Sequence, residues 1–311
     1  MGRITIIIWL VLLTLLGVAV WGLYLTLPGE KVNFLPANIS PVGTSSNTSL
    51  THVESEQFYE RMRFADRRIS YKIEDTCSNE KAEEMREAFD VFENLTVLEF
   101  YPSDNAQIVI ECSNLAPDPE FANHFVAGEG GPTEVINNTL YAVILSGKIS
   151  FFRDEECNEP KIAVHELFHV LGFNHNDDPG SILYPTLNCN QKIDDYLIDD
   201  LNSLYEADSN PDLKIERVNA TKSGPYLNFE VSVKNQGLAD ADDAILGVYE
   251  DGKLVKKFEL SDINIGTSKI LTVENVRISR FAEKLSFVVD PDSEIVEIFE
   301  NNNKLDLVLA N

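Results

Sequence analysis

Basic residues are scarce in this 311-residue chain. Lysine and arginine together number 25, against 51 aspartates and glutamates, so the formal net charge at pH 7 is −26. Nucleic-acid binding depends on basic surfaces, and this balance argues strongly against it. The acidic residues are spread along the chain instead of forming a tail. They favour solubility, in salty or calcium-bearing surroundings for example, and identify no substrate.

The N-terminus lacks acidic residues and a cleavage signal. Residues 4–27 form an uncharged run of 24 residues, and a helix of that length, about 36 Å, exceeds the ~30 Å hydrocarbon core of a membrane. No Ala-x-Ala-like site follows the run. Arg3 and the amino terminus favour a cytoplasmic N-terminus. We therefore predict a transmembrane signal anchor over residues 1–27, with the remaining chain extracytoplasmic; secretion after cleavage is the alternative.

Cysteine is also sparse, and the absence of a Cys-x-x-Cys pair argues against a cysteine-rich metal site. The four cysteines are Cys77, Cys112, Cys157 and Cys189. An even number beyond a membrane anchor predicts two disulfides, for which four cysteines allow three pairings. We favour Cys77–Cys112 and Cys157–Cys189, in which the second pair joins the segments on either side of the histidine motif.

Histidine is the third rare residue, with five in the chain, and three of them fall within eleven residues: His165, His169 and His175. On a helix, His165 and His169 lie one turn apart on the same face and can bind one metal ion. Gly172 allows the sharp turn that brings His175 back as a third ligand, which leaves the fourth position of a zinc ion open for catalysis. A His-Glu-x-x-His pair alone can arise by chance on an amphipathic helix, but the added glycine and third histidine favour one catalytic Zn²⁺.

The run from His165 to His175 and the residues after it resemble the metzincin zinc peptidases, and within them the matrixin branch. The resemblance covers roughly residues 66–207 and is carried by the histidine motif, Asp178-Pro179-Gly180, Tyr184-Pro185 and residues 193–205. It implies an α+β domain with a twisted sheet, a zinc helix and a C-terminal helix. It also implies peptide-bond hydrolysis, with Glu166 as general base on a zinc-bound water.

The chain departs from the family in the turn expected beneath the zinc, where Leu183 replaces a methionine. This exchange conserves volume and typically costs less than ~1.5 kcal/mol, so we expect the site to persist. Residues 28–54 are rich in Pro, Ser, Thr and Asn, which predicts a flexible stalk, and they contain no cysteine to block the zinc as a pro-segment. In the family a substrate pairs with an edge strand, which we assign to Leu140–Leu145.

Within the predicted catalytic domain, residues 55–207, the spacing of apolar residues predicts the remaining strands and helices. Residues 69–73 alternate as a strand, and residues 79–92 are helical, with Met85 and Phe89 near one face. Residues 133–152 predict a pair of strands and residues 192–206 a final helix. Asp177 and Asp178 are candidates to orient a histidine ligand, or they form a solvated acidic turn.

From residue 208 to residue 311 the periodicity is that of strands. Leu227, Phe229, Val231 and Val233 alternate with polar residues, and Asp251-Gly252 is typical of a hairpin turn. About seven short strands predict an Ig-like sandwich. Residues 233–237 and 289–302 resemble the CARDB module, an adhesion-related domain of prokaryotic surface proteins. Its acidic residues are compatible with Ca²⁺, although solvated turns explain them more simply.

These features together predict a membrane-anchored extracytoplasmic zinc endopeptidase that acts on a peptide or protein substrate. The alternative is a catalytically impaired metalloprotease-like surface protein with an adhesion or binding role. Leu183 favours the alternative. The sequence leaves the substrate and the oligomeric state undetermined, but the presence of Glu166 and all three histidines favours the enzyme.

Overall fold

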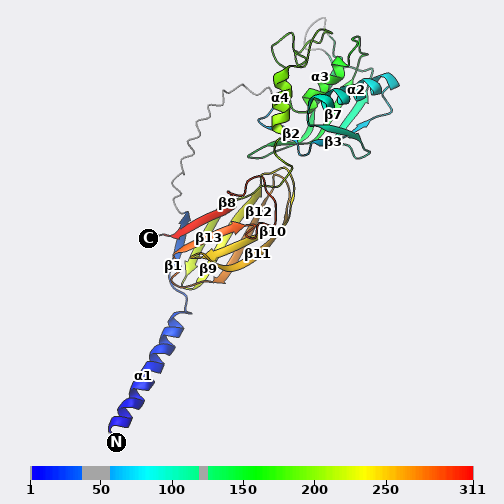
Figure 1. Cartoon of the computed structure of the whole chain (residues 1–311). Helices are drawn as coiled ribbons and strands as arrows, with labels where there is room; N and C mark the ends of the chain where they lie inside the picture. Colours follow the sequence, from blue (N-terminus) through cyan, green and yellow to red (C-terminus); the bar gives the residue numbers. More distant parts are fainter. Residues whose placement is uncertain (1, 37–56, 119–124, 311) are drawn as a thin grey trace. The chain divides into compact units, whose positions relative to one another are not determined.

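The structure, a computed structural model, describes residues 2–36, 57–118 and 125–310 (Figure 1). These residues form two compact units with separate hydrophobic cores. One unit contains α1 (Gly2–Tyr24), β1 (Lys31–Pro36) and the strands after residue 210, and the other contains the strands and helices between residues 57 and 210. An apolar helix, a domain of mixed strands and helices and an all-β sandwich are present, as predicted.

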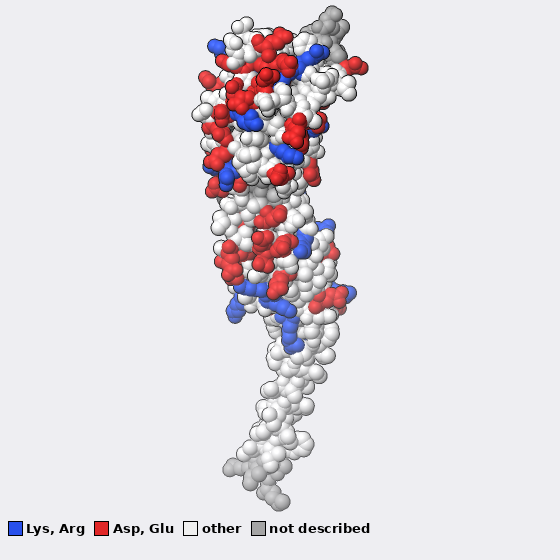
Figure 2. Space-filling view, turned by 90° about the vertical axis from the view of Figure 1, so that its right-hand side faces the viewer, with Lys and Arg blue, Asp and Glu red and all other residues white. Residues whose placement is uncertain are grey.

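Helix α1 is apolar all round. Its segment Ile6–Tyr24 has a mean hydropathy of 2.6, and none of it is buried. No acidic or basic side chain is visible on its described part in Figure 2. By length and composition this helix can cross a membrane.

The prediction of a flexible stalk over residues 28–54 is wrong at its start. Residues 31–36 form β1, a strand of the sandwich. Lys31–Asn33 pair with β8 (Leu213–Ser223), and Phe34–Pro36 pair with β14 (Lys304–Leu309), so β1 links these two strands. The Phe34 side chain is buried in the sandwich core. Burial of this apolar surface stabilises the packing of β1 on the sandwich. Residues 37–54 of the predicted stalk lie outside the described residues.

The sandwich alternates apolar and polar residues as predicted. Leu227, Phe229, Val231 and Val233 are buried, and Asp251 and Gly252 have φ angles of 45° and 81°, which a type I′ hairpin turn requires. The strand order is β11-β10-β13-β14-β1-β8-β9-β12. The bounds after residue 210 are β8 (Leu213–Ser223), β9 (Tyr226–Asn235), β10 (Ala241–Glu250), β11 (Lys253–Ile263), β12 (Ser268–Arg277), β13 (Lys284–Val289) and β14 (Lys304–Leu309).

The other unit is built on a mostly parallel sheet of order β2-β7-β5-β3-β4, with β6 antiparallel to β7. Helix α2 (Asn79–Leu95) packs its apolar face on the core, and the hydroxyl of Ser78 caps its first turn by accepting from Lys81 N. The strands are β2 (Met62–Phe64), β3 (Arg68–Ile73), β4 (Glu99–Pro102), β5 (Ile108–Cys112), β6 (Gly128–Asn137) and β7 (Ala142–Phe151).

The edge strand next to the histidine motif is β6. The prediction that Leu140–Leu145 form this edge strand is therefore wrong. Residues 142–145 belong to β7, which pairs with β6 on one side and with β2 and β5 on the other. Strand β7 therefore offers no free edge at these residues. Strand β6 pairs with β7 alone among the described strands, and it contains the Gly-Glu-Gly-Gly run at residues 128–131.

The two remaining helices are α3 (Lys161–Val170) and α4 (Asp195–Leu204). Arg63 fixes the end of α4. Its fully buried guanidinium donates to Leu204 O at 2.6 Å and to Ala207 O at 3.2 Å, and it lies over the Tyr205 ring. A cation is favourable where a helix leaves its last carbonyls unpaired. Burial lowers the pKa of Arg63, and the carbonyl contacts offset the cost of burying its charge.

Candidate metal centre

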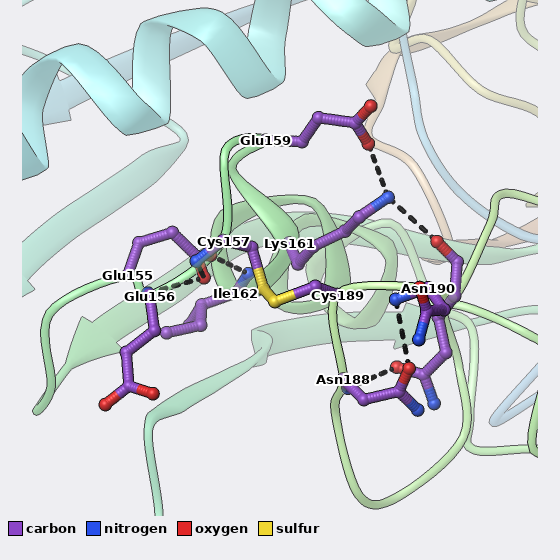
Figure 3. Close-up of a disulfide and its surroundings, with 10 residues drawn as sticks. Glu155, Glu156, Cys157, Glu159, Lys161, Ile162, Asn188, Cys189 and Asn190 are labelled. Carbon is purple, nitrogen blue, oxygen red and sulfur yellow. Dashed lines mark hydrogen bonds and ion pairs between the residues drawn. A yellow bond between two sulfur atoms is a disulfide. The ribbon is translucent and has the colours of Figure 1, made fainter.

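Helix α3, which contains the histidine pair, is held at its start by one carboxylate and one disulfide. Glu155 accepts from the backbone N–H groups of Cys157 and Ile162, each at 2.9 Å. Cys157 is bonded to Cys189, and Lys161 donates to Gln191 O at 2.8 Å (Figure 3). The start of α3 is thus tied to the loop around residue 190. A carboxylate at a helix N-terminus also interacts favourably with the helix dipole.

Gly172 ends the histidine helix and turns the chain. Its φ is +100°, a conformation that L side chains rarely adopt. A Cβ at this position would lie 2.8 Å from Cγ of Met62, so a side chain is excluded by space as well. The turn returns His175 to the two histidines of α3, as the sequence predicts.

Three imidazole nitrogens converge at the centre. Nε2 of His165 lies 3.0 Å from Nε2 of His169 and 3.2 Å from Nε2 of His175, and the latter two lie 3.2 Å apart. A tetrahedral ion with Zn–N bonds of 2.0–2.1 Å separates its ligands by roughly 3.3 Å. The nitrogen spacing fits a zinc ion.

The opposite nitrogens of two rings show which tautomer is present. Nδ1 of His165 lies 2.6 Å from Ile182 O, and Nδ1 of His169 lies 2.7 Å from Phe173 O. A carbonyl oxygen only accepts, so both Nδ1 atoms hold the proton and both Nε2 atoms present a lone pair. Burial lowers the pKa of His165 to about 3 and that of His169 to about 4, which keeps both rings neutral. Converging lone pairs with no proton between them fit a cation.

Glu166 lies against the edge strand. It is 4% exposed, and burial raises the pKa of its carboxyl to about 8, although a hydrogen bond from the Gly130 N–H opposes this shift. The approach of helix and strand needs residues without side chains. A Cβ on Gly130 would lie 2.4 Å from Glu166 O, and one on Gly128 would lie 2.8 Å from Glu166 Oε1.

Leu183 lies in the turn that follows the third histidine, and it is fully buried in the domain core. The turn is fixed by Ser181, whose hydroxyl donates to Asp194 Oδ2 at 2.5 Å and accepts from Asn176 Nδ2 at 2.8 Å. Ile182 in this turn supplies the carbonyl that orients His165. Leu183 therefore packs in the core as a hydrophobic side chain.

The structure brings together three of the residues that the sequence selects, His165, His169 and His175. Glu166 follows His165 on helix α3 and lies against Gly128 and Gly130. Both favoured disulfides, Cys77–Cys112 and Cys157–Cys189, are formed. The imidazoles of His165 and His169 are oriented by backbone carbonyls and not by Asp177 or Asp178; the Asp178 carboxylate accepts from Gly180 N instead.

Sequence reasoning misses several supporting residues. Ser181 and Asp194 show no pattern in the sequence, because their contact depends on the fold of the turn. Phe58 is also missed, and its ring centroid lies 6.1 Å from that of His169. The glycine spacing at residues 128–131 is a visible signal, but only the packing of α3 on β6 explains it.

Comparison with solved structures finds CARDB domains. The crystal structure of the CARDB domain of the PF1109 protein from Pyrococcus furiosus, in complex with di-metal ions, is 24% identical, covers 32% of this chain and 88% of that chain, and gives a TM-score of 0.26. A solution NMR structure of the same domain is 26% identical over 32% and 94% of the two chains, with a TM-score of 0.25. A domain of a putative cell surface protein from Methanosarcina acetivorans is 22% identical over 32% and 90%, with a TM-score of 0.26.

No curated protein matches the sequence. Two family models do. The matrixin model, which describes zinc-dependent metallopeptidases, matches residues 63–206, and the CARDB model matches residues 210–306. The first match contains the histidine cluster and Glu166, and the second contains the strands β8–β13. Residues 63–206 therefore match a matrixin domain, and residues 210–306 that follow match a CARDB domain.

Proposed function

We propose that this protein is a membrane-anchored extracytoplasmic zinc endopeptidase. The observation that supports it best is the convergence of three imidazole Nε2 atoms, two of which present lone pairs because their Nδ1 atoms face carbonyls. His165, His169 and His175 would hold the ion. Zinc, when bound, supplies Lewis acidity that polarises a peptide carbonyl and lowers the pKa of water.

Glu166 is the general base in this proposal. Its carboxylate removes a proton from the attacking water and returns the proton to the leaving amine. Burial raises the pKa of the Glu166 carboxyl to about 8, and the positive charge of a zinc ion on the neighbouring histidines would oppose this shift and favour the carboxylate. The N–H of Gly130 orients the carboxylate by hydrogen bonding.

The substrate would add to strand β6. This strand pairs with β7 alone among the described strands, and its glycines lie against Glu166. An extended peptide that pairs with the free edge gains affinity from backbone hydrogen bonds, largely independent of its sequence. Such pairing places a peptide bond beside the general base.

Helix α1 would anchor the enzyme, with the chain after residue 28 outside the cytoplasm. The two disulfides support an oxidising compartment. Strand β1 starts seven residues after the end of α1. A soluble form for assays therefore has to begin near residue 28, because a fragment that starts at residue 55 lacks a strand of the sandwich.

The test uses the full chain in detergent micelles, loaded with zinc, on an unfolded protein and a broad peptide library. We expect cleavage that a chelator abolishes and that added zinc restores. The matched variant Glu166→Gln retains zinc and loses cleavage. Folded, zinc-loaded protein that cuts no peptide would overturn the proposal.

The replacement of methionine by Leu183 favours a second candidate, a surface protein with a binding role and little activity. In that case zinc content is normal, and Leu183→Met raises the cleavage rate at least tenfold. We favour the enzyme, because Leu183 is fully buried and fills its place in the core.

A further inference from the structure

The CARDB domain contains a second group of buried polar side chains that the peptidase reaction does not use. The group consists of Asp212, Glu297, Asn302 and Asn303, which we name the carboxylate–amide cluster. Asp212 is 0% exposed, Glu297 7% and Asn303 6%. Carboxylates are rarely buried to this degree unless they are paired or bind a metal ion.

The amide nitrogens of the two asparagines donate hydrogen bonds to the two carboxylates. Asn303 Nδ2 donates to Glu297 Oε1 at 2.6 Å, and Asn302 Nδ2 donates to Asp212 Oδ1 at 3.0 Å. The other oxygen of Glu297 accepts from Leu213 N. Each asparagine therefore turns its amide nitrogen toward a carboxylate, and the other polar atom of its side chain, Oδ1, is an acceptor.

Those remaining acceptors have no donor. Oδ1 of Asn302 and Oδ1 of Asn303 are buried and form no hydrogen bond with any residue that the structure describes. A buried acceptor without a partner costs about 1–3 kcal/mol. Both oxygens belong to side chains that are hydrogen-bonded to the carboxylates of Asp212 and Glu297, so a cation bound among these four side chains would give the amide oxygens a partner.

Electrostatics within the cluster agree with this reading. The pKa of Glu297 is raised to about 8, first by burial and also by the negative charges of Glu300 and Asp212, although hydrogen bonds from Leu213 N–H and the Asn303 amide oppose this shift. Glu297 forms no ion pair with a described lysine or arginine. A nearby cation would remove this repulsion and satisfy the amide oxygens at once.

We propose that the carboxylate–amide cluster is a binding site for a hard divalent cation, Ca²⁺. The ligands are carboxylate oxygens of Asp212 and Glu297 and the amide oxygens of Asn302 and Asn303. All are oxygens, and carboxylate and amide oxygens are preferred by Ca²⁺, whereas zinc prefers nitrogen and sulfur. Irregular coordination also suits Ca²⁺ better than Mg²⁺, which demands near-ideal octahedral geometry.

A cation bound to the carboxylate–amide cluster would connect the start of the CARDB domain with its last strand. Asp212 lies just before β8, and the two asparagines lie just before β14. The loop that contains Glu297 is joined to the same place through Ile298 N and Pro211 O, 3.0 Å apart. A cation that binds only the folded state stabilises the folded domain, and here it would hold the segments before β8 and β14 together.

The test is equilibrium dialysis of Ca²⁺ against the full chain in detergent micelles, with zinc saturating the histidine site. We expect Glu297→Gln to lose one bound Ca²⁺ per chain, or to weaken that site about tenfold or more, because it removes a charged ligand. The matched control Glu259→Gln makes the same charge change at an exposed position of β11 and leaves binding unchanged.

Asn302→Ala is the second variant, because Asn302 is only partly buried and its loss is tolerated more readily than a change at Asp212. We expect it to fold and to bind Ca²⁺ more weakly. Hydrogen exchange of β8 and β14 should slow on adding Ca²⁺ in the wild-type chain and not in Glu297→Gln. Equal Ca²⁺ binding by wild type and both variants, or no binding by the wild type at millimolar Ca²⁺, overturns the proposal. The cluster would then be a hydrogen-bonded network around a protonated Glu297.

Discussion

The histidine cluster of the matrixin domain and the carboxylate–amide cluster of the CARDB domain both bring acceptor atoms together. In the first, backbone carbonyls hold the protons of two rings on the far side, so ring nitrogens converge. In the second, asparagine donors are used on carboxylates, so oxygens remain. The ligand atoms differ, and so does the cation that each cluster favours. Ring nitrogens favour Zn²⁺, whereas carboxylate and amide oxygens favour Ca²⁺.

The two clusters also differ in how far apart their residues lie in the sequence. The histidines fall within eleven residues, whereas Asp212 and Asn302 are separated by 90 positions. A helix and one turn assemble the first cluster. The second requires the whole sandwich to close. The first is therefore visible in the sequence and the second is not.

The largest effect is expected for a substitution at Glu166 that lowers the cleavage rate without changing zinc binding. Glu166→Gln removes the general base and leaves the three imidazoles in place, so we expect kcat to fall by about 10²–10⁴-fold. Zinc content, measured by mass spectrometry of the bound metal, should stay at one per chain. A variant that keeps more than a tenth of the activity would contradict the role of Glu166.

The next effect concerns the contact between β6 and α3. In Gly130→Ala the new Cβ would lie 2.4 Å from Glu166 O, so helix and strand must separate. We expect a loss of stability of about 1–3 kcal/mol and at least a tenfold loss of kcat. Urea unfolding and peptide cleavage measure the two quantities.

Gly131→Ala is the matched control for this change. It is the adjacent glycine, and a Cβ there meets nothing within 4 Å. Activity and stability should stay near those of the wild type. Equal losses in the two variants would show that strand propensity, and not the contact with Glu166, is responsible.

The third prediction concerns pH and the carboxylate–amide cluster without calcium. Because the pKa of Glu297 is raised to about 8 in the folded domain, the folded state retains a proton that the unfolded state loses above about pH 4.5. The free energy of unfolding of the sandwich should therefore fall as pH rises from about 4.5 to 8, by a few kcal/mol at most.

Hydrogen exchange of sandwich peptides in a urea series, with a calcium chelator present, measures this dependence. Glu297→Gln should flatten it, and saturating Ca²⁺ should reduce it by favouring the ionised carboxylate. A slope of opposite sign in the wild type would mean that Glu297 is ionised in the calcium-free domain.

The smallest effect is expected at the floor of the histidine cluster. Leu183→Met conserves volume at a fully buried position, so stability should change by less than about 1.5 kcal/mol. We expect kcat/KM and zinc affinity within about threefold of the wild type. A rise of tenfold or more would favour the binding protein as the native role.

Local patterns predicted much of the fold. The apolar face of α2, the alternation in β9 and the Asp251-Gly252 turn are each set by a few neighbouring residues. Two assignments failed for a common reason. Strand β1 and the edge position of β6 depend on which strand pairs with which, and pairing joins residues far apart in the sequence.

By itself the sequence determined the histidine motif, the glycine turn, the apolar helix and the even number of cysteines, because spacing on a helix and residue type are local properties. Tertiary structure alone decided that residues 31–36 complete the sandwich, that β6 is the edge beside Glu166, and that backbone carbonyls orient the imidazoles. It also brought Asp212 and Glu297 to one place. Such contacts arise only when distant segments close around a common core, and local patterns do not record them.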